Sequence, residues 1–131
     1  MSSYFLYAED DTDDIALFRD AMHSETNRDN TVYVNNGFEL LNYLQRVKTD
    51  ESYPCLIILD FYLPKVNGMD TLILLRTDDL YRLIPVIIFS SKLSQADKDK
   101  CMSLGADIVV KPAGYTNWHE IITQFRTYLD D

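Results

Sequence analysis

Residues 55–68 read CLIILDFYLPKVNG, a run of apolar residues that stops at a single acid, Asp60. Five apolar residues in a row before a charged one are typical of a strand that is buried on both faces. Pro64 and the pair Asn67 and Gly68 then mark a turn. Beyond the turn, apolar residues recur with helical spacing at Met69, Leu72, Ile73 and Leu75. This stretch therefore predicts a buried strand that ends in an acid, then a turn and a helix.

The same strand–helix unit occurs five times along the chain. The expected strands are 4–8, 31–34, 55–59, 86–89 and 108–110. The expected helices are 11–24, 38–47, a stretch from residue 69, a stretch between Ser94 and Gly105, and 117–128. Apolar strands that each precede a helix indicate a parallel sheet covered on both faces. With right-handed crossovers, this predicts an α/β fold, a five-stranded parallel doubly wound sheet, in a single domain spanning residues 1–131.

Composition excludes several classes of function. Twelve Lys and Arg stand against 21 Asp and Glu, a formal net charge of −9, which argues against binding to nucleic acid or to anionic membrane surfaces. No apolar run approaches the length of a membrane span, and the first residues lack the pattern of a signal peptide. Cys55 and Cys101 lie in apolar segments and are expected to be reduced core residues. We therefore expect a cytoplasmic protein.

Polar residues follow four of the expected strands. The first strand is followed by residues 9–11, all acidic, the third by Asp60, the fourth by residues 90–91, both Ser, and the fifth by Lys111. The carboxyl ends of parallel strands meet at one edge of a sheet, so these side chains are expected to lie together. Clustered carboxylates repel each other and favour a cation, and hard oxygen ligands suit Mg²⁺. A carboxylate beside Mg²⁺ can also act as a nucleophile towards phosphorus.

This order of residues resembles the receiver domain of two-component response regulators, specifically the stand-alone kind. The matching fragments are 4–11, 59–60, 63–64, 67–68, 84–91, 105–106 and 110–112. The resemblance covers essentially the whole chain and implies the flavodoxin-like, receiver-type (βα)5 fold. Residues 77–84 resemble a subgroup of stand-alone bacterial regulators related to phytochrome-linked ones.

The resemblance implies a function for Asp60. As in the family, it would accept a phosphoryl group from a phosphohistidine on a sensor histidine kinase or a histidine phosphotransfer protein. Asp10, Asp60 and the backbone carbonyl of Tyr62 would hold Mg²⁺, and Glu9 would act on it through water. The chain would catalyse only its own phosphorylation and dephosphorylation, without being an enzyme for another substrate, and would switch its binding to a downstream protein target.

The resemblance also assigns the other strand-end residues. Ser90 matches the hydroxyl that moves to meet the phosphoryl group, and Lys111 matches the family's lysine. The peptide bond between Lys111 and Pro112 is expected to be cis, as is usual in the family. Ile108 stands where the family has a switch aromatic, so a coupled swing of hydroxyl and ring is not expected here.

Three other functions are alternatives. A pseudo-receiver would bind partners without regulation by phosphorylation. A Mg²⁺-dependent phosphohydrolase with an aspartyl nucleophile, like the haloacid dehalogenase-like enzymes, needs a second Asp two residues after the first, where this chain has Tyr62. A flavin-binding electron carrier needs a Ser-, Thr- or Gly-rich phosphate loop after the first strand, and residues 9–11 are acidic. Asp11, Asp13 and Asp14 are interpreted only as acids that favour a helix start.

Overall fold

The computed structural model describes residues 3–26, 30–47, 52–114 and 116–129. Five strands in this part form one parallel sheet in the order β2-β1-β3-β4-β5. The strands are β1 (Phe5–Ala8), β2 (Thr31–Val34), β3 (Leu56–Leu59), β4 (Val86–Ser90) and β5 (Asp107–Val110). The helices are α1 (Thr12–Thr26), α2 (Gly37–Arg46), α3 (Gly68–Thr77), α4 (Gln95–Ser103) and α5 (Trp118–Arg126). The predicted doubly wound α/β fold is confirmed.

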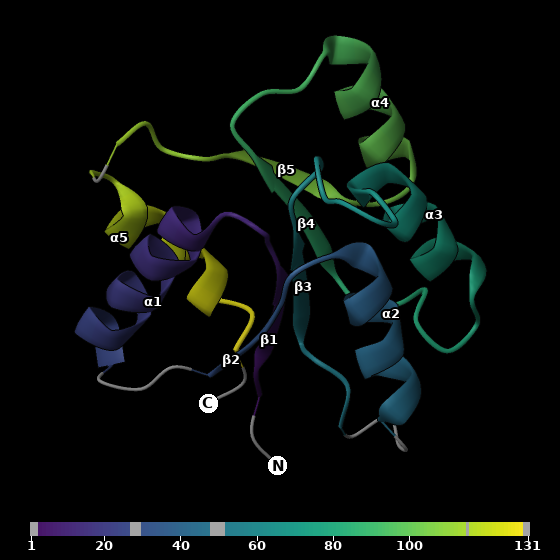
Figure 1. Ribbon diagram of the computed structural model, residues 1–131, viewed down its shortest axis with the longest axis horizontal. Helices are drawn as coiled ribbons and strands as arrows, with labels where there is room; N and C mark the ends of the chain where they lie inside the picture. The colour runs from purple at the N-terminus through teal and green to yellow at the C-terminus, as the bar shows by residue number, and fades with distance from the viewer. Residues whose placement is uncertain (1–2, 27–29, 48–51, 115, 130–131) are drawn as a thin grey trace.

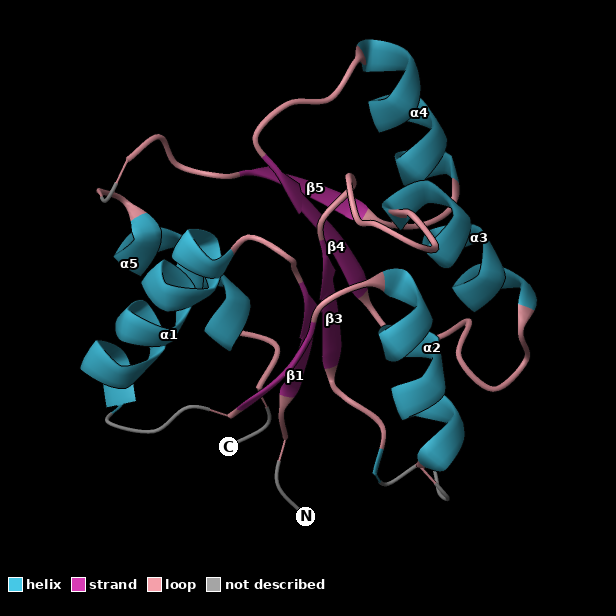
Figure 2. Ribbon diagram, in the orientation of Figure 1, coloured by secondary structure: helices cyan, strands magenta, loops and turns pink. Residues whose placement is uncertain are grey.

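Helices cover both faces of the sheet (Figure 1, Figure 2). Helices α1 and α5 lie side by side on one face, and α2, α3 and α4 lie on the other. Because side chains alternate along a strand, successive residues enter different cores: Phe5 and Tyr7 pack towards α1 and α5, whereas Leu6 and Ala8 pack on the opposite side. All four residues of β1 are fully buried, which explains why the strand is apolar throughout. None of the described helices is long and apolar enough to cross a membrane.

Capping residues mark the helix ends near the positions that the sequence predicts. The Ser94 side chain accepts a hydrogen bond from the backbone N–H of Asp97 at 3.1 Å, so it caps α4, and Gly105 follows that helix with a φ of 79°. The pair Asn67 and Gly68 does more than turn the chain, because the Asn67 side chain accepts from the N–H of Asp70 at 2.9 Å and caps α3.

The expected cis peptide bond before Pro112 is wrong. The described residues contain no cis bond, so the bond between Lys111 and Pro112 is trans. The trans form is the ordinary state of such a bond, favoured by about 0.5–1 kcal/mol. With this trans bond, the Lys111 side chain still reaches the acidic residues at the sheet edge.

Arg76 fastens two connecting segments together at the end of α3. Its guanidinium donates to the carbonyls of Arg82 and Ile84, at 3.2 and 2.9 Å, in the segment between α3 and β4. It also donates to the carbonyls of Leu104 and Gly105, at 2.6 and 3.3 Å, between α4 and β5. One side chain thereby satisfies four carbonyls in two segments that are distant in sequence.

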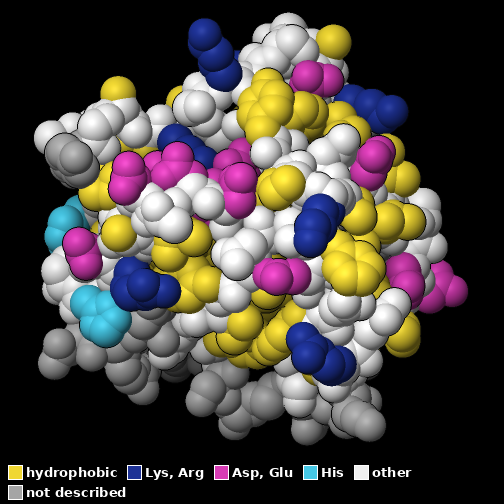
Figure 3. All heavy atoms as spheres, in the orientation of Figure 1, with side chains coloured by type: hydrophobic (Ala, Val, Ile, Leu, Met, Phe, Trp, Pro, Cys, Tyr) yellow, Lys and Arg dark blue, Asp and Glu magenta, His cyan; other side chains and the backbone are white. Residues whose placement is uncertain are grey.

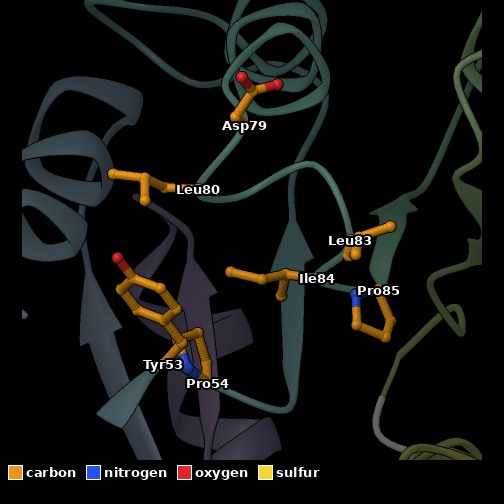
Figure 4. A pocket seen from close by; sticks show the side chains of 7 residues that line it. All are labelled: Tyr53, Pro54, Asp79, Leu80, Leu83, Ile84 and Pro85. Atoms are coloured by element: carbon orange, nitrogen blue, oxygen red, sulfur yellow. The ribbon is translucent and has the colours of Figure 1, made fainter. Parts of the chain in front are cut away.

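The segment fixed by Arg76 forms one wall of a surface hollow of about 370 Å³, shown in Figure 4. Tyr53 and Pro54 line it from the approach to β3, and Leu80 and Leu83 line it from the segment before β4. Both of these approaches lead to the amino-terminal ends of the strands. The hollow is therefore at the opposite end of the sheet from the polar residues that follow the strands.

We expect Arg76→Ala to lower the free energy of unfolding by about 2–3 kcal/mol, because several charge-assisted hydrogen bonds are lost together. Urea unfolding measures this change. Arg82→Ala is the matched control, since its exposed side chain pairs with the exposed Asp79, and it should change stability by less than about 0.5 kcal/mol. Equal losses in the two variants would contradict the role of Arg76.

Candidate functional site

Strand register brings the acidic residues to one edge of the sheet. Ala8 of β1 is paired with Leu59 of β3, so the next residues, Glu9 and Asp60, emerge side by side. Leu59 in turn is level with Ile88 of β4. Figure 3 shows Asp and Glu side chains gathered at this edge, over the segment that joins β1 to α1, with basic side chains beside them.

Three carboxylates form the centre of this site. Glu9, Asp10 and Asp60 each offer an oxygen, and these oxygens lie within 4.8 Å of one another. Glu9 and Asp60 are buried, whereas Asp10 is exposed to solvent. This is a set of hard oxygen donors with one open side, which suits a small divalent cation that keeps some of its water.

Lys111 enters the same cluster from the end of β5. Its ammonium nitrogen Nζ lies 2.6 Å from Glu9 Oε1, 2.8 Å from Asp14 Oδ2 and 3.0 Å from Asp60 Oδ2. The Lys111 side chain is only 8% exposed, so these ion pairs are little screened by solvent. Each of the three N–H groups of the ammonium therefore has its own carboxylate acceptor.

Burial and mutual repulsion separate the pKa values of the two buried carboxyl groups. Desolvation, with the hydrogen bond and the negative charge of Asp60, raises the pKa of Glu9 to about 8, against the opposing effect of Lys111. Burial also acts to raise the pKa of Asp60, but Glu9, Lys111 and the N–H of Tyr62 together hold it below its usual value. Burial disfavours the charged ammonium of Lys111, yet its carboxylate partners raise its pKa. Near neutral pH, Glu9 therefore keeps its proton, whereas Asp60 and Lys111 are charged.

The backbone around Asp60 fixes the direction of its carboxylate. The N–H of Tyr62 donates to Asp60 Oδ1 at 3.1 Å, while Lys111 binds the other oxygen. The loop then folds back so tightly that a Cβ at Gly68 would lie 2.5 Å from the carbonyl oxygen of Asp60. Glycine is required there for this close approach of two backbones. Tyr62 lies two residues after Asp60, and its side chain is exposed.

Ser90 ends β4 at the same edge and is almost fully buried. Its carbonyl accepts a hydrogen bond from the N–H of Lys111 at 3.0 Å, which ties the two strand ends together. Beside it is a hollow of about 200 Å³ that Ser90 lines together with Lys92 and Ile108. Ile108 therefore borders open space next to the Ser90 end of the site.

The structure adds two residues that the sequence analysis missed. Asp14, interpreted as a helix-start acid alone, also accepts from Lys111. Tyr7 is fully buried in β1, and its hydroxyl donates to Glu9 Oε1 at 3.2 Å. The interpretation holds for Asp11, whose carboxylate accepts from the N–H groups of Asp13 and Asp14 and caps α1. A charged residue in the first turn of a helix gives no signal in the sequence that its side chain reaches a residue at the end of a distant strand.

The raised pKa of Glu9 predicts a pH dependence of stability. Unfolded Glu9 ionises near its ordinary value of 4.5, whereas folded Glu9 keeps its proton to about pH 8. The folded state therefore binds more protons in this range, and the free energy of unfolding should fall as pH rises from about 5 to 8 without divalent cations. Glu9→Gln should remove part of this fall in stability, and the part removed should correspond to several degrees in Tm. Thermal unfolding in EDTA measures it. Identical slopes in Glu9→Gln and wild type would contradict the assignment.

Comparison with known proteins identifies the family. The sequence profile of the response regulator receiver domain matches residues 5–123. The polar-differentiation response regulator DivK of Brucella anthropi is 30% identical over 132 residues, which cover 100% of this chain and 99% of DivK.

Two solved structures share the fold. The phosphorylated cyanobacterial phytochrome response regulator RcpA has a TM-score of 0.82 at 24% identity, covering 98% of this chain and 99% of RcpA. The Mn²⁺-bound response regulator Rcp1 has a TM-score of 0.81 at 20% identity, covering 95% of this chain and 92% of Rcp1. The profile match over most of the chain, with a relative of nearly the same length, shows that this chain belongs to the response regulator receiver domain family of two-component signalling.

Proposed function

We propose that the chain is a single receiver domain, residues 1–131, that accepts a phosphoryl group on Asp60 and thereby switches its binding to a protein partner. The observation that carries the proposal is the Asp60 carboxylate, buried at a strand end and paired with the Lys111 ammonium at 3.0 Å. The pairing keeps Asp60 ionised and therefore nucleophilic, because it lowers the pKa of Asp60 despite burial. The membership of the chain in the receiver family supports the same reading.

The chemistry is a phosphoryl transfer between a nitrogen and an oxygen. An oxygen of Asp60 forms a bond to phosphorus as the bond from phosphorus to the imidazole nitrogen of a phosphohistidine breaks. The imidazole leaves with that electron pair, and Asp60 becomes an acyl phosphate. Such transfers depend chiefly on positioning and on charge neutralisation, which Lys111 supplies as a point charge and Ser90 as a hydroxyl donor. Hydrolysis of the acyl phosphate returns the carboxylate.

The carboxylate cluster fits Mg²⁺ by the nature of its donors. Glu9, Asp10 and Asp60 converge within 4.8 Å with only oxygen atoms, and the exposed position of Asp10 leaves room for water. Asp10, Asp60 and the carbonyl of Tyr62 would hold the ion, with Glu9 acting through water. When bound, the ion supplies positive charge that offsets the charges of carboxylate and phosphoryl oxygens. The Mn²⁺-bound form of the relative Rcp1 is consistent with this assignment.

Phosphorylation would switch the surface by replacing the single carboxylate charge of Asp60 with a phosphoryl group that carries about two negative charges. Ser90 is the nearest candidate to respond, since it ends the neighbouring strand β4. The hollow next to Ile108 gives the segment after Ser90 space to move without a swinging aromatic ring. The switch would therefore act through this segment and α4, which follows it.

The partners follow from the chemistry. The phosphodonor is a sensor histidine kinase or a histidine phosphotransfer protein, and the acceptor of the signal is a downstream protein. The net charge of −9 supports protein partners over nucleic acid or an anionic membrane. Within the described part of the chain, Cys55 and Cys101 form no disulfide, which fits a reducing compartment and supports a cytoplasmic location. A pseudo-receiver remains the alternative that the next experiment separates.

Asp60→Asn should abolish phosphorylation, because an amide oxygen is too weak a nucleophile to form the acyl phosphate. Incubation with acetyl phosphate and Mg²⁺, followed by intact-protein mass, measures the adduct. Asp70→Asn, an exposed acid in the next helix, is the control and should be labelled like wild type. Full labelling of Asp60→Asn would refute the site. No adduct in wild type would favour a pseudo-receiver.

Mg²⁺ should raise the Tm of the wild type by several degrees, since a ligand that binds only the folded state stabilises it. Asp10→Asn should lose most of this increase, because it removes the exposed carboxylate of the cluster. Thermal unfolding with and without Mg²⁺ measures the difference. Asp13→Asn, exposed in the following helix turn, serves as the control. An unchanged Mg²⁺ response in Asp10→Asn would remove Asp10 from the site.

A further inference from the structure

Asp14 stands apart from the other partners of Lys111. It belongs to the first turn of α1, whereas Glu9 and Asp60 directly follow strands. It is also outside the cluster of three carboxylates that suits a cation. Its bond to the ammonium is nonetheless between the other two in length, with Asp14 Oδ2 at 2.8 Å from Lys111 Nζ.

The surroundings or the charge of the other two acceptors of Lys111 change during the proposed reaction. Asp60 becomes an acyl phosphate and loses its carboxylate charge, and Glu9 belongs to the cluster that would hold a cation. Asp14 is the acceptor of Lys111 whose chemistry stays the same before and after transfer. Lysine carries its charge on a flexible four-carbon stem, so it needs such a fixed acceptor to stay in place.

The backbone from which the Asp14 side chain projects is held rigidly. Its N–H donates to Asp11 Oδ1 at 3.2 Å, which caps α1, and Phe18 anchors that helix fully buried in the core. The Asp14 side chain is 22% exposed, so solvent competes only in part for its oxygens. The segment after Lys111, by contrast, is a loop in which Gly114 has a φ of 72°. Helix α1 therefore offers the ammonium a firmer support than its own strand end.

We propose that Asp14 is a positioning residue for phosphoryl transfer, one that holds the Lys111 ammonium beside Asp60. This inference rests on the proposed function and deepens it. Asp14 touches neither phosphorus nor the attacking oxygen; it acts through Lys111. Charge alone would have the opposite effect on the rate, since a nearby carboxylate repels an anionic donor. The two effects differ in sign, so they can be told apart.

The test measures the rate of Asp60 labelling by acetyl phosphate with Mg²⁺. Asp14→Ala should slow labelling about tenfold or more, the usual size of a lost hydrogen bond to a charged group. Asp14→Asn keeps an acceptor oxygen and should fall between Asp14→Ala and wild type, and Asp14→Glu should restore most of the rate. Asp13→Ala, exposed in the same turn, is the matched control and should stay within about twofold of wild type. If charge repulsion dominates, Asp14→Ala and Asp14→Asn will both label faster, which overturns the proposal.

A double-mutant cycle separates positioning from a merely structural role. In a Lys111→Ala background, Asp14→Ala should change the labelling rate by less than about twofold, because the residue through which it acts is gone. Urea unfolding of the same four proteins reports whether the two residues are coupled in stability.

Coupling in stability with equal labelling rates for Asp14→Ala and wild type would make the contact structural only and would overturn the proposal. If wild type is labelled and Asp14→Ala matches it, only the role of Asp14 fails; if wild type is not labelled, the proposed function fails, and this role with it.

Discussion

The ammonium of Lys111 is the charge on which the site depends. Glu9, Asp14 and Asp60 converge on it within 3.0 Å, and two of these carboxylates are nearly inaccessible to solvent. Buried carboxylates at such distances are costly without a cation, because their desolvation and mutual repulsion add. The lysine joins the end of β5 to the ends of β1 and β3 and to the start of α1. A local group of charges thereby connects three parts of the chain that are distant in sequence, residues 9–14, Asp60 and Lys111.

The parallel sheet makes this convergence possible. Since β1, β3 and β4 run side by side in register, the residue after each strand arrives at the same edge. The tight loop after Asp60, with Gly68 against its carbonyl, then limits where the carboxylate can point. Burial of all four residues of β1 and of β3 supplies the rigid base from which these side chains project. The strands that form the packed core therefore also position the side chains of the site at the edge of the sheet.

Sequence alone was sufficient for the strands and for the residues at their ends, because apolar runs such as Leu56–Leu59 are unambiguous and parallel topology brings their ends together. It was insufficient for Asp14, whose partner lies 97 residues away and depends on how α1 lies against the sheet. The prediction of a cis bond before Pro112 came from the resemblance to the family, and it was wrong. Whether such a bond is cis or trans depends on its tertiary surroundings, which no local sequence pattern encodes. The hydroxyl of Tyr7 was overlooked for a similar reason: an aromatic residue in an apolar strand looks like core.

The guanidinium of Arg76 has a consequence for how the molecule can move. It joins the segment before β4 to the segment before β5, at the end of α4 that is remote from Ser94. Helix α4 is thus pinned at its C-terminal end. Its N-terminal end follows the residues after Ser90, which border a hollow. Motion of α4 is therefore a tilt about a fixed pivot, with slow amide exchange expected near Gly105 and faster exchange near Leu93.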